Sequence, residues 1–201
     1  MRADAARNAD RILHSARAVF AEVGPDAPLE EVARHAGVQI RTLYNHFPAK
    51  ADLVRAVLDR SIAEHLEPAS ERALADSDPL RGLVGMVEAA MSLAARELST
   101  LAAARTAGLL TAGVYPPFYE SLTRLTRRAQ EAGLLRDDLV PDDLPRIMAM
   151  LTSTLWSMDA HGDGWRRYLA LVLDGLSPAS ASPLPPPVAL VKETRGGGWP
   201  L

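Results

Sequence analysis

The 201-residue sequence contains no cysteine and no long apolar run. Without cysteine there can be no disulfide, no thiolate metal site and no cysteine nucleophile. No segment approaches the run of about 18 apolar residues that a transmembrane helix needs, and the polar start MRADAARNAD lacks the apolar segment of a signal peptide. We therefore expect a cytoplasmic protein with no membrane partner.

Motifs for catalysis are also missing. The sequence has no glycine-rich phosphate loop after a strand, no G-x-S-x-G and no HExxH. Asp159, His161 and Asp163 form a small polar cluster, but it lies in a glycine-rich turn without further ligands nearby. We interpret it as a polar loop, so the sequence predicts no enzyme, no metal and no cofactor.

Helical spacing of the apolar residues runs through most of the chain. Apolar residues make up 48% of the sequence, which is enough to bury a core, and their spacing predicts an all-α fold. Besides a helix pair within 28–50, the pattern predicts helices over 9–23, 50–66, 80–98, 100–110, 118 to about 132 and 165–176, and one that opens at 141–143. Pro68 is expected to end the helix over 50–66, and Arg124, Arg127 and Arg128 are expected to form a solvated face.

The most informative stretch is PLEEVARHAGVQIRTLYNHFPAK, residues 28–50. Its first half places apolar residues at i, i+3, i+4 and i+7, which is one face of a helix; these are Leu29, Val32, Ala33 and Ala36. Gly37 follows where a helix can end in the left-handed conformation, and the apolar pattern restarts at Val38. The stretch therefore predicts two short helices joined by a sharp turn.

The second of these helices carries hydrogen-bonding side chains and no acid. Between Val32 and Ala51 the cations are Arg34, Arg41 and Lys50, in a chain of net charge −3. The positive potential is thus local, as binding to a phosphate backbone requires. Arg41 and Asn45 lie one turn apart, where arginine can bind guanine and asparagine can bind adenine in a major groove. Tyr44, His46 and Lys50 are better placed for phosphates, and the alternative is an ordinary helical hairpin in a core.

Residues from Arg7 to about Glu64, above all AGVQIRTLYNHFPAKADL, resemble the DNA-binding domain of the tetracycline-repressor (TetR) family of transcription regulators. The resemblance is carried by Gly37-Val38, Thr42-Leu43-Tyr44, His46-Phe47 and Lys50. It implies that the DNA backbone is contacted by Thr42, Tyr44, His46 and Lys50, and that sequence preference is set by Gln39, Ile40, Arg41 and Asn45. The sequence departs from the family at Ala27-Pro28, where relatives commonly carry a hydroxyl residue, and at Ile40, where some carry a polar one.

The resemblance also implies a second helical domain, in which the middle helices enclose an effector cavity and the last two helices form a homodimer. Adaptable apolar side chains suit such a cavity. The ligand-binding candidates are Met86, Met91, Tyr115, Phe118, Leu155 and Trp156. Ordinary core packing explains the same side chains about equally well.

We therefore expect an N-terminal three-helix helix-turn-helix DNA-binding domain (1–49), a connecting helix (50–66), a helical effector-binding and dimerisation domain (67–176) and a disordered Pro/Gly-rich tail (177–201). The predicted function is a repressor that binds a near-palindromic operator in double-stranded DNA as a homodimer. A small apolar or amphipathic effector is expected to release it. The alternatives are an effector-independent DNA-binding or protein-docking module and a helical enzyme.

Overall fold

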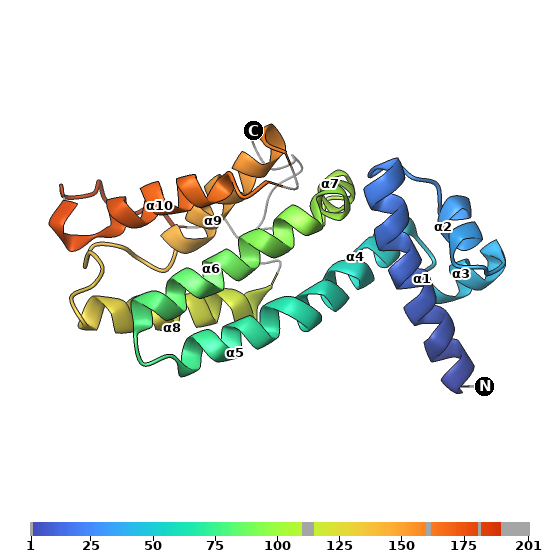
Figure 1. Ribbon diagram of the computed structural model, residues 1–201, viewed down its shortest axis with the longest axis horizontal. Coiled ribbons are helices and arrows are strands. Elements are labelled where there is room, and N and C mark those ends of the chain that lie inside the picture. Colours follow the sequence, from blue (N-terminus) through green and yellow to red (C-terminus); the bar gives the residue numbers. More distant parts are fainter. Residues whose placement is uncertain (1, 110–114, 160–161, 181, 190–201) are drawn as a thin grey trace. The chain divides into compact units, whose positions relative to one another are not determined.

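The computed structural model describes residues 2–109, 115–159, 162–180 and 182–189, and this part of the chain is helical without a strand (Figure 1). The all-α prediction is confirmed. The helices are α1 (Arg2–Val23), α2 (Leu29–His35), α3 (Ile40–His46), α4 (Lys50–Ser61), α5 (Glu67–Ala75), α6 (Pro79–Arg96), α7 (Leu98–Thr106), α8 (Pro116–Glu131), α9 (Asp143–Thr154) and α10 (Trp165–Leu176), with a π-helical turn η1 (Ile62–Leu66) and 3-10 turns η2 (Leu155–Ser157) and η3 (Pro178–Ser180).

The described helices fall into two compact units. The first contains α1 to α4 together with α7, and the second contains α5, α6, α8, α9 and α10. The chain passes between them at Ile62–Ala63, within η1, and again at Arg96–Glu97, between α6 and α7.

The first unit is closed by one apolar core. Its fully buried side chains come from α1, α2, α3 and α4, and they include Ile12, Ala16, Phe20, Val32, Leu43, Leu53 and Val57. Ala103 and Ala104 of α7 belong to the same core. The alanine-rich α7 therefore packs on α1 and α4, although it follows α6 of the second unit in the sequence.

The helix that begins at Lys50 does not stop where the sequence predicted. After α4 the chain passes through the π turn η1 and continues as α5, so the prediction that Pro68 ends the helix is wrong. Pro68 stands in the first turn of α5. A proline is tolerated there because an amide in a first turn has no intrahelical partner to lose.

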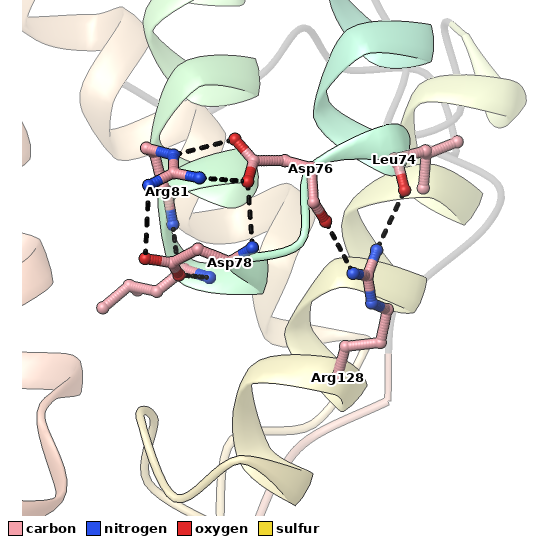
Figure 2. Close-up of polar contacts among 6 residues, drawn as sticks. Leu74, Asp76, Asp78, Arg81 and Arg128 are labelled. Atoms are coloured by element: carbon pink, nitrogen blue, oxygen red, sulfur yellow. Dashed lines mark hydrogen bonds and ion pairs between the residues drawn. The ribbon is translucent and has the colours of Figure 1, made fainter.

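In the second unit, a corner of charged residues joins α5 to α6 (Figure 2). The carboxylate of Asp78 caps α6 by accepting from the amides of Leu80 and Arg81 at 3.0 and 3.1 Å. The Arg81 guanidinium in turn donates to Asp76 at 2.6 Å. This hydrogen bond, with the Asp78 amide, holds the pKa of Asp76 below its ordinary value.

Arg128 of α8 closes the same corner from the other side (Figure 2). Its guanidinium donates to the carbonyls of Leu74 and Asp76 at 3.0 and 2.7 Å, and so satisfies acceptors that the end of α5 leaves free. The predicted solvated face is therefore wrong for Arg128, which is half-buried, whereas Arg124 and Arg127 are exposed.

Gly82 of α6 lies close to the backbone of α5. A Cβ atom at this position would stand 2.5 Å from the carbonyl oxygen of Ala73 and 3.2 Å from Leu125 Cδ2. The crossing therefore has no room for a side chain at residue 82.

The segment after α10 contacts the second unit in its described part. Arg136 donates to the Ser182 carbonyl at 2.6 Å, and the Leu184 amide donates to Asp138 at 3.0 Å. Arg136, followed by that amide, holds the pKa of Asp138 well below its ordinary value. A disordered tail over 177–201 stays a prediction, and residues 190–201 lie outside the described residues.

Candidate DNA interface

The turn between α2 and α3 has the geometry that the glycine predicted. Leu29, Val32 and Ala33 face the core of the first unit, and Gly37 follows with a φ of +63°. The amide of Val38 then donates to the Ala33 carbonyl at 3.0 Å, which closes the end of α2. This left-handed residue turns the chain sharply, so that α3 starts in a new direction.

Arg11 of α1 fastens this turn, and nothing in the sequence pattern indicated that role. Its Nη2 donates to the carbonyls of Ala36 and Gly37 at 2.7 and 3.2 Å. A cation at the carbonyl end of a helix also interacts favourably with the helix dipole. Arg11 therefore holds the turn between α2 and α3 to α1 by two hydrogen bonds.

Helix α3 is anchored by the buried Leu43, and Ile40 packs partly against the same core. Leu43 is the only residue of α3 that is buried, with 0% of its surface exposed. The side chains predicted to contact bases or phosphates from this element are exposed at Gln39, Arg41, Tyr44 and Asn45, and half-buried at Ile40, Thr42 and His46. One short helix thus gathers these predicted DNA contacts on the surface of the first unit.

Arg41 carries the least compensated charge of this surface. Among the described residues it has no hydrogen bond and no ion pair, whereas the Arg34 guanidinium pairs with Glu31 in α2. The nearest following acid is Asp52, whose carboxylate accepts from the Ala49 amide at 3.0 Å at the start of α4. Arg41 is therefore available to an external acceptor.

Lys50 has a partner inside the unit. Its Nζ donates to the Ala27 carbonyl at 2.8 Å and lies 5.7 Å from the centroid of the Phe20 ring. The side chain therefore braces α4 against the turn between α1 and α2, besides any contact it makes to DNA.

The ligand-binding candidates all lie in the second unit, but in different environments. Met86, Met91, Phe118 and Leu155 are buried, with exposed fractions of 0, 0, 5 and 2%. Trp156 is half-buried. Core packing accounts for the four buried side chains, and buried apolar side chains are also what an effector cavity would need.

Tyr115 differs from the other candidates because its hydroxyl is engaged. It donates to Glu67 at 2.6 Å, and burial together with this hydrogen bond raises the pKa of Tyr115 to about 12.

A cavity of about 80 Å³ lies elsewhere in the unit, lined by Thr123, Thr126, Arg127, Gln130, Leu139, Pro141 and Leu144. None of the predicted ligand-binding residues lines it. The Thr126 hydroxyl is buried there and has no hydrogen-bond partner among the described residues, so an ordered water suits this cavity.

Exposed apolar side chains mark the last two helices. Met150 of α9 and Leu171 of α10 are each 58% exposed, and Tyr168 of α10 is 41% exposed. The polar loop predicted between these helices cannot be compared in full, because His161 lies outside the described residues.

Comparison with known proteins places these features in a family. The profile described as "Bacterial regulatory proteins, tetR family" matches residues 12–57, which cover α2, α3 and most of α4. A solved TetR transcriptional regulator from Streptomyces coelicolor is 32% identical, with a TM-score of 0.59, and the match covers 85% of this chain and 98% of that one. This chain belongs to the TetR family of transcriptional regulators. A TetR regulatory protein from Mycobacterium vanbaalenii is also 32% identical, with a TM-score of 0.56 and coverage of 88% and 98%.

A third structure shows the fold alone. A transcriptional regulator from Saccharomonospora viridis, solved in complex with choline, is 23% identical with a TM-score of 0.65, and the match covers 84% of this chain and 96% of that one. A search of curated proteins found no match.

Membership of the TetR family confirms several predictions from the sequence. The chain is a DNA-binding transcription regulator with a helix-turn-helix, and it is not an enzyme. TetR regulators bind DNA and small-molecule effectors and act as dimers. Within the described part of the chain, no helix is long and apolar enough to cross a membrane.

Proposed function

We propose that this TetR regulator is a homodimeric repressor that binds a near-palindromic operator through α3 and is released by a small apolar or amphipathic molecule. The observation that carries the proposal is the surface of α3. One buried residue, Leu43, anchors the helix, and Arg41 is left without an internal partner among the described residues. An unpaired guanidinium on an exposed helix is suited to the O6 and N7 acceptors of guanine.

The division of labour along α3 follows from side-chain chemistry. We assign base contacts to Gln39, Ile40, Arg41 and Asn45, with Ile40 suited to a thymine methyl group. We assign phosphate contacts to Thr42, Tyr44, His46 and Lys50. An ammonium group has three donors, so Lys50 can keep its hydrogen bond to Ala27 and still donate to a phosphate. That internal hydrogen bond would orient Lys50 before DNA arrives.

Dimerisation is supported by the apolar side chains of the last two helices. Met150, Tyr168 and Leu171 leave large apolar surface on α9 and α10 that a second copy would cover. A two-fold dimer uses the same patch on both subunits. Its two α3 helices would enter major grooves about one helical turn, or a multiple of it, apart, which is why a near-palindromic operator is expected.

Release requires that the effector prefer the state that does not bind DNA, because a ligand with equal affinity for both states shifts nothing. A hundredfold preference is worth about 2.7 kcal/mol per site, and two sites in a dimer would suffice to clear an operator of moderate affinity. The candidate contacts are Met86, Met91, Tyr115, Phe118, Leu155 and Trp156. The choline complex of the Saccharomonospora viridis protein supports a small-molecule ligand in this fold.

The DNA step is tested by selecting duplexes from a random pool and measuring affinity for the selected and scrambled sequences. The duplex upstream of the chain's own gene is the first natural candidate, since such regulators often act on adjacent genes. Failure to select any sequence over the random pool would refute the proposal.

The release step is tested by titrating apolar and amphipathic compounds into the operator complex of the wild type and of Trp156→Ala. We expect a blunted response in the variant with nearly unchanged operator affinity in the absence of compound. A normal response would move the pocket elsewhere, and loss of the dimer would assign Trp156 to the subunit interface.

A further inference from the structure

Glu97 is a buried carboxylate with partners from three helices of the first unit. Only 3% of its surface is exposed. Its Oε1 accepts from Arg17 of α1 at 2.7 Å and from the Ser61 hydroxyl of α4 at 2.8 Å, and its Oε2 accepts from the Thr100 hydroxyl of α7 at 3.0 Å. We call these four residues the Glu97 clamp.

The clamp sits where the chain passes between the two units. Ser61 is the last residue of α4, and the crossing at Ile62–Ala63 follows directly. Glu97 is itself the first residue after the other described crossing, at the end of α6. The hydrogen bond between Ser61 and Glu97 therefore joins the two segments of the first unit that lie next to these crossings.

Arg17 extends this tie to the recognition motif. It belongs to α1, the same helix whose Arg11 holds the turn between α2 and α3. A displacement of the end of α6 would thus act, through Glu97, on α1 and α4 together. The crossing after Ser61 is π-helical, and such turns occur frequently at functional sites in helices.

Burial makes the cationic partner of Glu97 costly to lose. A buried carboxylate without its cation is left with an uncompensated charge, which is strongly unfavourable. Packed contacts also favour discrete arrangements over gradual shifts, so opening of the clamp would separate two states.

We propose that Glu97 is a positioning residue that couples α6 to the orientation of the DNA-binding helices. The proposal rests on the proposed function and adds the residue through which the two units communicate. Coupling of this kind is reciprocal. Operator binding at α3 should therefore reduce the opening motions of α6, even when no effector is present.

Hydrogen exchange read by mass spectrometry, with and without the selected operator duplex, tests this coupling. In the wild type, operator binding should slow amide exchange in α6 by at least about fivefold, the lower end of ordinary coupling between sites. Glu97→Gln keeps the shape of the side chain and removes its charge. In this variant, operator binding should slow amide exchange in the first unit but not in α6. The fold-change in operator affinity caused by this variant should be much smaller than the fold-change in the exchange protection of α6.

Asp10→Asn is the matched control. Asp10 of α1 pairs with Arg60 of α4 at 2.7 Å, so the variant also breaks a carboxylate contact between α1 and α4, but the pair is exposed and does not include Glu97. Its α6 protection should equal that of the wild type. If Glu97→Gln does not fold, Ser61→Ala decides instead, because it removes the bond between the crossings and keeps the ion pair to Arg17.

The outcomes separate the coupling from the DNA binding on which it rests. If α6 is protected equally in the wild type and in Glu97→Gln, or is not protected in the wild type at all, the coupling role is overturned while the repressor proposal stands. If the wild type binds no selected duplex, both fall together.

Discussion

Replacing Gly82 by alanine should destabilise the second unit, because the new methyl group would meet a backbone atom. The Cβ would lie 2.5 Å from the Ala73 carbonyl oxygen, and 3.2 Å from Leu125. A flexible side chain can turn away from such a contact, but a carbonyl can move only if α5 and α6 separate. Separation would also disturb the hydrogen bonds of Arg81 and Arg128 at the same corner.

The magnitude follows from two opposing effects. Overpacking of this kind costs about 1–3 kcal/mol, and contact with backbone favours the upper end of that range. Alanine regains up to about 1 kcal/mol over glycine within a helix. The net loss for Gly82→Ala should therefore be about 1–2 kcal/mol in the free energy of unfolding.

Gly85 provides the control within the same helix. It is exposed, and a Cβ there would have nothing within 4 Å, so Gly85→Ala should gain up to about 1 kcal/mol from helix propensity alone. Thermal and urea denaturation followed by circular dichroism would measure both variants. For a chain of this size, 1 kcal/mol corresponds to about 2–4 °C in Tm. If Gly82→Ala were as stable as Gly85→Ala, the close crossing of α5 and α6 would be refuted.

Three further predictions concern charged residues. Arg41→Ala should cost about 1–3 kcal/mol of binding free energy on the selected operator and relax the sequence preference of the protein. Lys50→Ala should weaken binding to all duplexes and reduce the slope of log affinity against log salt concentration by about one per subunit. Equal losses of affinity and equal slopes for the two variants, in titrations at several salt concentrations, would contradict the assignment. Arg11→Met should lower the free energy of unfolding by about 1 kcal/mol by removing hydrogen bonds to Ala36 and Gly37, and should weaken operator binding without changing the salt slope; a reduced slope would mean that Arg11 contacts phosphate. Because the pKa of Asp76 is depressed in the folded state, its ionised carboxylate stabilises the fold above the ordinary aspartate pKa of about 4, and this stabilisation is lost as the pH falls through the folded pKa. In urea denaturation, the difference in stability between the wild type and Asp76→Asn should therefore be larger at pH 7 than in strong acid. A difference independent of pH would refute the role of the ionised carboxylate.

Local patterns predicted most of the helices well. The apolar spacing placed the last helix at residues 165–176, which are the bounds of α10. Gly37 marked the turn before α3 because glycine is strongly favoured at positions with a positive φ. In these places the signal lies within a few neighbouring residues, which sequence reasoning can use directly.

The chemistry of Pro68 predicts a helix end, but this proline stands in the first turn of α5, where a missing N–H is tolerated. The other failures occurred where a distant residue decides the outcome. Arg128 resembled its exposed neighbours, and only the end of α5 beside it makes it a capping residue. The roles of Arg11 and Glu97 depend on partners 25 and 36 residues away in the sequence, so no periodicity could indicate them.

The central claim is that two copies of α3 bind operator DNA as a symmetric pair. Hydroxyl-radical footprinting on the selected duplex tests it most directly, with the wild type and Arg41→Ala compared at equal occupancy. We expect two equivalent protected patches on one face of the duplex, separated by about 10 base pairs or a multiple of that distance, and loss of sequence preference within both patches in Arg41→Ala. A single patch, or a footprint that does not depend on sequence in the wild type, would contradict the account.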